Sequence, residues 1–247
     1  MISKADIKYI VSLQLKKQRQ KYGQFVVEGE KSIKEMLKSR FTIDRVFATP
    51  DRINEVQKQF KHHSVTEVSE KDLSAISAHR APQGVLAIVN MPDNTLSAKD
   101  FKHPLCIGLD NIQDPGNLGT IIRIADWYGI STIICSQGCA DVYNPKCINS
   151  TMGSIARVKV VYEALETVSE KFHLPMIAAV LEGYNLHTLN NPLKGMLIIG
   201  NEGHGIGPEL LSKAAHRITI PRFGEAESLN AAVSTAIIID NLIQRLS

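Results

Sequence analysis

The segment that decides the fold is Leu105-Cys-Ile-Gly-Leu-Asp-Asn-Ile-Gln-Asp-Pro-Gly-Asn117-Leu-Gly-Thr-Ile-Ile-Arg123. It joins an apolar, strand-like run to a polar loop, and a helical pattern follows. Two later segments have related features: Ile198-Ile-Gly-Asn-Glu202-Gly-His-Gly205, and Ile218-Thr-Ile-Pro221 with Glu227-Ser-Leu-Asn230. In an open α/β sheet, ligands bind just beyond the carboxyl ends of the strands. The three loops therefore predict one shared pocket, and the chain is expected to be an enzyme or a cofactor binder.

The second half of the chain alternates between strand and helix patterns. Strands are predicted over 105–109, 131–135, 158–161, 176–181, 196–200 and 217–220. Helices are predicted over 117–128, 145–155, 164–172, 208–214 and 228–246. Such alternation predicts an α/β fold with a mostly parallel sheet and helices on both faces. The last helix is apolar almost all round, so we expect the core to bury most of it and a dimer interface the rest.

The first hundred residues form a smaller α/β pattern. Helices are predicted over 3–17, 30–38, 51–60 and 70–77, and strands over 25–29, 43–48 and 84–89. The turn-rich run Met91-Pro-Asp-Asn-Thr95 then leads into a polar stretch. We therefore expect two domains, 1–98 and 99–247.

Composition and charge limit the class of protein. The 247 residues carry a net charge of +3, but residues 1–40 hold ten Lys/Arg against four Asp/Glu. This basic N-terminal segment suggests an anionic polymer partner, although a solvated basic helix is the commoner explanation of such a charge run. No apolar run reaches the roughly 18 residues of a membrane span. The N-terminus lacks a signal-peptide core, and the four cysteines lack CxxC pairs, so we expect buried, reduced thiols in a cytoplasmic protein.

The sequence contains no complete motif for dinucleotide binding, nucleotide triphosphate binding or hydrolysis. A GxGxxG motif starting at Gly203 fails because residue 208 is proline, and no GxxxxGK[ST], GxSxG or HExxH is present. The run Gly203–Gly207 reads GxGxG, but the next strand ends in Ile220-Pro-Arg222 without the acidic ribose anchor. His204 stands alone in its loop, which favours a structural role. No ligand cluster in the sequence predicts a metal site.

The three polar segments together resemble the signature motifs of the SpoU/TrmH-type RNA ribose 2′-O-methyltransferases of the SPOUT superfamily. The matching positions are Asn111, Pro115, Asn117, Gly119 and Arg123, then Gly200, Glu202 and Gly205, then Ile220, Pro221, Ser228, Leu229 and Asn230. The likeness covers residues 105–247 with all three motifs in order. It implies a deep trefoil knot in this domain, bound S-adenosylmethionine and a homodimer formed through the catalytic domain. Pattern reasoning alone predicts an ordinary doubly wound sheet, because true knots are nearly absent among folds.

The resemblance also implies roles for individual residues. The residues expected to be catalytic are Asn117, Arg123, Glu202, Ser228 and Asn230. Those expected to hold the cofactor, largely through backbone groups, are Gly200, Ile220 and Leu229. The family proposal makes Arg123 a base, but an arginine with a pKa above about 12 hardly deprotonates. An electrostatic role toward a phosphate or the developing alkoxide suits the guanidinium better.

Structural roles compete with these functional ones. Asn117 and Ser228 are both placed to cap the helices that follow them. Glu202 follows an apolar strand, where an unpaired carboxylate is costly, so it needs a partner. Arg123 is the expected partner, in which case the two residues form a structural ion pair.

The N-terminal region resembles the substrate-binding domain of the ribosomal-RNA members, a fold similar to ribosomal proteins that bind kink-turns. The cue is Phe25-Val-Val-Glu-Gly-Glu-Lys-Ser-Ile-Lys-Glu-Met36. Its candidate RNA phosphate contacts are Lys16, Lys17, Arg19 and Lys21. Family members that act on tRNA typically lack a full domain here, so ribosomal RNA is favoured over tRNA. The alternatives left open are a tRNA ribose methyltransferase and a non-catalytic RNA-binding protein that kept the fold.

Overall fold

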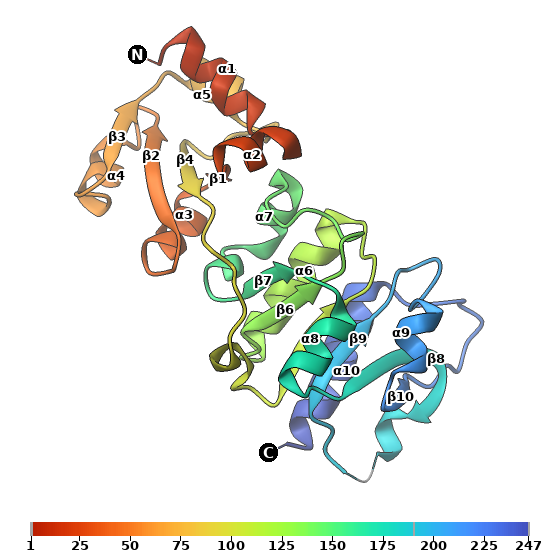
Figure 1. The fold of residues 1–247 in the computed structure, drawn as a ribbon. Helices are drawn as coiled ribbons and strands as arrows, with labels where there is room; N and C mark the ends of the chain where they lie inside the picture. Colours follow the sequence, from red (N-terminus) through yellow and green to blue (C-terminus); the bar gives the residue numbers. More distant parts are fainter. Residues whose placement is uncertain (1, 190, 247) are drawn as a thin grey trace. The chain divides into compact units, whose positions relative to one another are not determined.

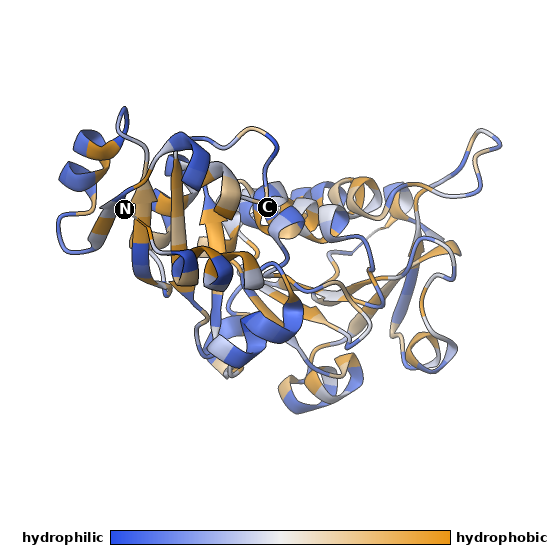
Figure 2. Cartoon of the chain, turned by 90° about the horizontal axis from the view of Figure 1, so that it is seen from above, coloured by the Kyte–Doolittle hydropathy of each residue, from blue (hydrophilic) through white to orange (hydrophobic). Residues whose placement is uncertain are grey.

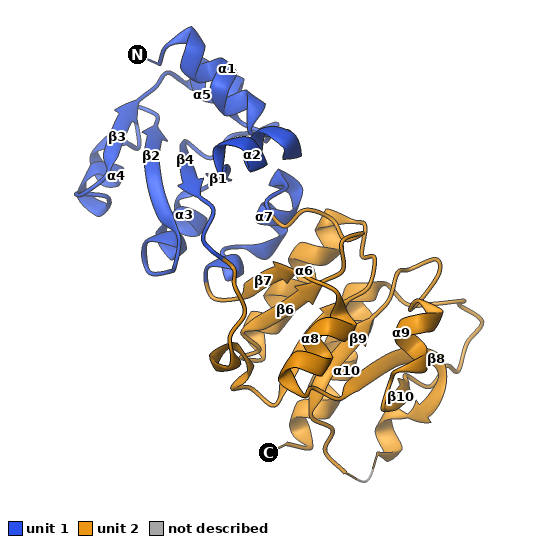
Figure 3. Cartoon of the chain, viewed as in Figure 1, with its two compact units in different colours: residues 1–93, 143–156 blue, residues 94–142, 157–247 orange. Residues whose placement is uncertain are grey.

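The computed structural model describes residues 2–189 and 191–246, and the chain divides into two compact units (Figure 3). The first unit comprises Met1–Asp93 and Tyr143–Ala156, and the second comprises Asn94–Val142 and Arg157–Ser247. The segment Tyr143–Ala156 groups with the first unit, although its place in the sequence assigned it to the C-terminal domain. It lies against β1 (Gln24–Glu28) and includes Tyr143, whose ring contacts Phe25.

The first unit is built on a four-stranded mixed sheet (Figure 1). Its helices are α1 (Lys4–Ser12), α2 (Lys16–Tyr22), α3 (Glu30–Leu37), α4 (Ile53–Gln59), α5 (Glu70–Ile76) and α7 (Pro145–Thr151). Its strands, in the order β1-β4-β2-β3, are β1, β4 (Val85–Asn90), β2 (Thr42–Ala48) and β3 (Ser64–Glu67). β4 pairs antiparallel with β1 and β2, whereas β3 runs parallel to β2.

Two features of this unit differ from the sequence prediction. The helix expected over 3–17 is wrong as one element, because α1 ends at Ser12 and α2 begins at Lys16. Ile10 and Leu13 are buried in the core at that break, so tertiary packing outweighs a continuous helical pattern. Strand β3 was not predicted, since its four residues are at most partly buried and show no apolar alternation.

The second unit contains a six-stranded sheet, and every pairing between its neighbours is parallel. The strand order is β10 (His216–Thr219), β8 (Met176–Asn185), β9 (Gly195–Ile199), β5 (Leu105–Leu109), β6 (Thr132–Cys135), β7 (Lys159–Tyr162). The helices are α6 (Pro115–Trp127), α8 (Leu165–Phe172), α9 (Pro208–Ser212) and α10 (Ala231–Gln244), with short 3-10 turns at Ala98–Phe101 and Leu186–Thr188. The predicted parallel α/β sheet is confirmed.

Alternate residues along each strand of this sheet face opposite layers, because successive side chains of a strand point to opposite sides. Cys106, Met196 and Ile198 point to the face that α8 and α9 cover, where they join one hydrophobic cluster. α10 lies on the other side of the sheet in Figure 1 and packs against α6. Hydrophobic residues predominate in most strands, whereas the helices carry both hydrophobic and hydrophilic residues (Figure 2). This layering leaves the carboxyl ends of the strands uncovered for the loops that follow them.

The cysteines agree with the sequence prediction. All four are buried and none forms a disulfide, and burial raises the pKa of the Cys106 thiol to about 12. In the part of the chain that the structure describes, no helix has the length and apolar character to cross a bilayer.

Candidate active site

Three loops meet at the carboxyl edge of the second sheet. They follow β5, β9 and β10, and parallel pairing places the carboxyl ends of these strands on the same side. The loops enclose a cavity of about 650 Å³, a size typical of small-molecule sites. We call it the cofactor cavity. The loops after β9 and β10 line most of it, and the loop after β5 joins them through hydrogen bonds.

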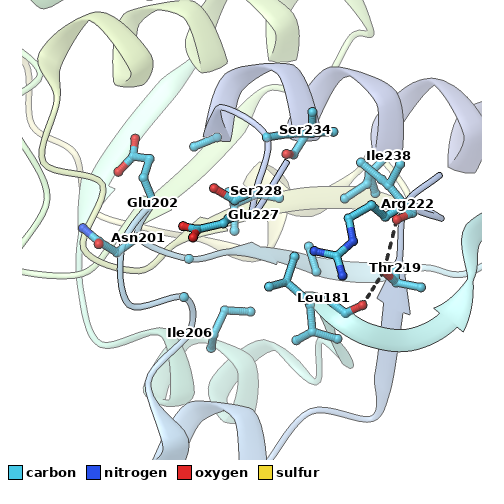
Figure 4. A pocket seen from close by; sticks show the side chains of 18 of the residues that line it. Leu181, Asn201, Glu202, Ile206, Thr219, Arg222, Glu227, Ser228, Ser234 and Ile238 are labelled. Carbon is cyan, nitrogen blue, oxygen red and sulfur yellow. Dashed lines mark hydrogen bonds between the residues drawn. The ribbon is translucent and has the colours of Figure 1, made fainter. Parts of the chain in front are cut away.

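Figure 4 shows part of the lining of this cavity. Asn201 and Glu202 come from the loop after β9, and Glu227 and Ser228 come from the loop that precedes α10. The three residues predicted to hold the cofactor, Gly200, Ile220 and Leu229, all line the cavity. Five of the eight predicted catalytic or cofactor residues are therefore lining residues, because Glu202 and Ser228 line it as well.

A chain of side-chain hydrogen bonds joins the three sequence motifs. Asn230 Nδ2 donates to Asn117 Oδ1 at 2.9 Å, and Asn117 Nδ2 donates to Glu202 Oε1 at 2.5 Å. Asn230 Oδ1 accepts from the backbone N–H groups of Ala232 and Val233 at the start of α10. That cap turns the amide of Asn230 so that its NH₂ faces Asn117. The N-terminus of α10 thereby fixes which group donates in both bonds, from Asn230 to Asn117 and from Asn117 to the Glu202 carboxylate.

The structure corrects both predicted helix caps. Asp114, not Asn117, caps α6 by accepting from the backbone N–H of Asn117 at 2.9 Å. Asn230, not Ser228, caps α10. Because Asp114 takes the capping role, the side chain of Asn117 is left to bind Glu202 and Asn230.

The predicted partnership of Arg123 with Glu202 is wrong. Glu202 accepts from Asn117, and among the described residues Arg123 forms no ion pair and does not line the cavity. Arg123 lies six positions after Asn117 on α6, which at about 100° per residue turns it to another face. Its side chain is exposed. Whatever role Arg123 has, it is not that of a structural counter-ion to Glu202.

The loop after β9 makes a tight hairpin, which we call the glycine loop (residues 200–207). Asn201 and Gly205 exchange two backbone hydrogen bonds of 3.0 and 2.9 Å. A Cβ on Gly200 would lie 2.3 Å from the carbonyl carbon of Gly205, so only glycine fits there. Asn201 also fixes the turn through Oδ1, which accepts from the backbone N–H of Gly203 at 2.8 Å. Sequence reasoning missed Asn201, whose only signal was its place beside Glu202.

The candidate RNA contacts belong to the first unit, where three of them are exposed and one is buried. Lys16, Lys17 and Lys21 are exposed on α2. Arg19 is buried at 2% exposure, and its Nη1 donates to the carbonyls of Leu13 and Gln14 at 2.9 and 2.7 Å. Its predicted role as a phosphate contact is wrong, because the guanidinium satisfies carbonyl groups of the turn between α1 and α2.

The fold and the site define an α/β domain with a small-molecule pocket built by three loops, and comparisons place the chain in a family. The model of the SpoU rRNA methylase family matches residues 104–240, and that of the MRM3-like substrate binding domain matches residues 4–87. The chain belongs to the SpoU rRNA methylase family.

Similar proteins cover nearly the whole chain. The 23S rRNA (guanosine(2553)-2′-O)-methyltransferase RlmP of Bacillus subtilis is 32% identical, over 93% of this chain and 92% of its own length. The 23S rRNA (uridine(2479)-2′-O)-methyltransferase of Streptomyces viridochromogenes is 33% identical, over 68% of this chain and 63% of its own length. The structure of an rRNA methyltransferase from Sinorhizobium meliloti with bound AdoMet matches with a TM-score of 0.86 and 29% identity, over 100% of this chain and 97% of that one.

Proposed function

We propose that this protein transfers a methyl group from S-adenosylmethionine to a ribose 2′-hydroxyl in ribosomal RNA. The observation that carries the proposal is the hydrogen-bonded chain Asn230–Asn117–Glu202, which joins all three family motifs beside the cofactor cavity. The relatives named above methylate 23S rRNA on the 2′-oxygen, and the Sinorhizobium structure contains AdoMet.

The cavity suits S-adenosylmethionine in size and lining. Its volume of about 650 Å³ lies in the range of nucleotide-sized ligands, and its walls are largely apolar side chains and loop backbone. Gly200, Ile220 and Leu229 bring the chain close enough for backbone groups to bind an adenine. When bound, S-adenosylmethionine supplies its methyl group as an electrophile on a sulfonium. No three His, Cys, Asp or Glu side chains gather as a metal site within residues 2–189 and 191–246.

The catalytic residues position the ribose and stabilise charge on its oxygen. Glu202 and Ser228 line the cavity, and Asn117 and Asn230 hold the Glu202 carboxylate in one orientation. Most of the rate enhancement then comes from aligning the 2′-oxygen with the methyl group. Arg123 does not line the cavity of its own chain, so its guanidinium would bind an RNA phosphate, or the developing alkoxide in the site of a second copy.

The experiment that tests the function uses the purified protein, tritium-labelled S-adenosylmethionine and total RNA from cells that lack the gene. A methylated ribose cannot support alkaline cleavage at its own phosphate, so the label should remain in an alkali-resistant dinucleotide from ribosomal RNA. Label in tRNA instead would favour the tRNA alternative. Tight RNA binding with no label would favour the non-catalytic alternative.

The finer fold predictions remain part of this proposal. We propose the division 1–98 for RNA binding and 99–247 for catalysis, with a trefoil knot at the end of the second domain. In support, the chain leaves β10, passes the cofactor cavity and returns to pack α10 against α6, which starts at the first motif. A cytoplasmic location likewise stays a prediction.

A homodimer through the catalytic domain is also proposed. Gly116, Thr120, Arg123 and Trp127 form one stripe on α6, spaced four, three and four residues apart. Trp127 is 83% exposed, and Val233 on the neighbouring α10 is 49% exposed. A second copy that covers this stripe would bury both side chains and bring Arg123 beside the partner.

Replacing Trp127 with aspartate should convert the dimer into monomers at micromolar concentration. Central interface tryptophans contribute about 2 kcal/mol or more, which corresponds to a dimer Kd raised roughly 30-fold. Trp127→Phe, which keeps an apolar ring, is the matched control and should remain dimeric. Sedimentation of the three proteins measures the effect, and an unchanged W127D dimer would place the interface elsewhere.

Charge reversal at Lys16 and Lys17 should weaken RNA binding and flatten its salt dependence. Each phosphate contact contributes about 0.7 to 0.9 to the slope of log K against log salt concentration, so the double variant should lose about 1.5. The control is Lys58→Glu with Lys61→Glu, which changes net charge equally at exposed lysines of the same unit. Equal slopes for both double variants would show that RNA does not cross α2.

A further inference from the structure

Asp110 is a buried carboxylate that is bonded to the glycine loop and does not line the cofactor cavity, and it lies outside the motif positions that have an assigned role. It follows β5 directly and is 7% exposed. No cation lies within ion-pair distance of it among the residues that the structure describes. An aspartate in such a place is costly unless both of its oxygens are hydrogen-bonded.

Both ends of the glycine loop are bonded to Asp110. Its backbone N–H donates to the carbonyl of Ile199 at 2.9 Å, just before the loop begins. Its Oδ2 accepts from the backbone N–H of Gly207 at 2.8 Å, where the loop ends. One residue thus closes the base of the loop that carries Gly200 and Glu202.

The second carboxylate oxygen of Asp110 is linked to the glycine loop through Asn111. Asp110 Oδ1 accepts from Asn111 Nδ2 at 2.9 Å, and Asn111 has a positive φ of 57°. In that conformation the Asn111 carbonyl accepts from Asn201 Nδ2 at 2.8 Å, inside the glycine loop. Both oxygens of Asp110 therefore face N–H donors, and an asparagine could satisfy only one of them.

We infer that Asp110 is a positioning residue for cofactor binding, which acts by holding the glycine loop at its base. It touches neither the cavity nor a reacting atom. Its two oxygens, through Gly207 and through Asn111, determine where Gly200 and Glu202 stand relative to the other two loops. This inference rests on the proposed function, because it takes the cavity to be the S-adenosylmethionine site.

The test is calorimetric titration of S-adenosylmethionine into wild-type protein, Asp110→Asn and Asp100→Asn. Asp110→Asn keeps the shape but turns an NH₂ toward one of the two donors, so its Kd should rise about tenfold or more. Asp100 is the matched control: it accepts from the Ser97 backbone N–H at 2.7 Å and pairs with Lys159, outside the cavity. Asp100→Asn should lower Tm while leaving Kd within twofold.

Two outcomes would overturn the inference: an unchanged Kd for Asp110→Asn, or an equal rise in Kd for Asp100→Asn at equal loss of Tm. Wild-type protein that fails to bind S-adenosylmethionine would instead contradict the proposed function. Should Asp110→Asn not fold, amide exchange of the wild-type protein decides. The Gly207 amide should then exchange far more slowly than the backbone amide of the exposed Glu202, which donates to no group among the described residues, and equal rates would overturn the inference.

Discussion

Replacing Arg123 with alanine should lower the rate of RNA methylation about 10²- to 10³-fold while the Kd for S-adenosylmethionine stays within a few-fold. That range is typical for loss of one charged or polar group that stabilises an oxyanion. Arg123 is exposed and forms no ion pair among the described residues, so Tm should not change. Single-turnover kinetics and calorimetry on the same preparation measure both effects.

Arg157→Ala is the matched control. Arg157 makes a two-pronged ion pair with Asp126 on α6, with distances of 2.8 Å from Nε to Oδ1 and from Nη2 to Oδ2. Its loss removes an arginine near the same helix without touching the proposed catalytic role. Activity should therefore persist, with a small drop in Tm. A collapse of cofactor affinity in Arg123→Ala would instead make Arg123 a structural residue.

Arg123→Lys separates an electrostatic anchor from a base. Lysine, with a pKa near 10.4, loses its proton far more readily than arginine. If residue 123 were a base, the lysine variant's activity would rise with pH up to about 10 as the neutral amine forms. An anchor needs the charged form, so we expect partial activity that is flat and then falls near pH 10.

Gly200→Ala should weaken S-adenosylmethionine binding at least 100-fold. The added Cβ would lie 2.3 Å from the Gly205 carbonyl carbon and 2.5 Å from its oxygen, and both atoms belong to the hairpin backbone. The hairpin cannot accommodate it without breaking the Asn201–Gly205 hydrogen bonds. Equilibrium binding of the cofactor measures the loss.

Gly203→Ala is the control within the same loop. A Cβ there meets only Asn201 Oδ1, at 3.5 Å, which is ordinary contact. Its cofactor affinity should stay within a few-fold of the wild type. Similar losses in both variants would mean that general loop flexibility, rather than the close approach at Gly200, controls binding.

The strands of the catalytic unit were predictable because each is a short, buried apolar run between turn signals. β5, β6, β7 and β9 lie within about one residue of their predicted bounds. β8 is longer than predicted. Its second half is exposed and so lacks the apolar pattern of a strand, but it pairs with β10 in a shifted register. That pairing has no signature in the local pattern, since long-range contacts decide it.

The site was predictable as a set of loops but not as a set of contacts. Asp114-Pro115 carries the signal for a helix start, a capping residue before proline, and this signal could have excluded Asn117 as the cap. Arg123 was wrongly predicted as the partner of Glu202. Its place in the first motif does not show which face of the helix it occupies. Asn117 and Arg123 share α6, yet only the former faces the glycine loop.

The roles of the basic residues in the N-terminal segment could not be predicted from the sequence either. The sequence does not distinguish the four basic residues Lys16, Lys17, Arg19 and Lys21. Only the fold shows that Arg19 is buried, because its guanidinium donates to two carbonyls of the turn after α1. The segment Tyr143–Ala156 is a second case. It lies between strands of the second unit in the sequence, but its contacts are with β1 and α3 of the first.

The most direct test of the central claim is a map of ribose 2′-O-methylation in RNA from cells with and without this gene. The account predicts one ribosomal-RNA position that loses its methyl group in the absence of the gene, regains it with the wild-type protein and stays unmodified with Arg123→Ala. Ribosomal-RNA methylation that is identical with and without the gene would contradict it.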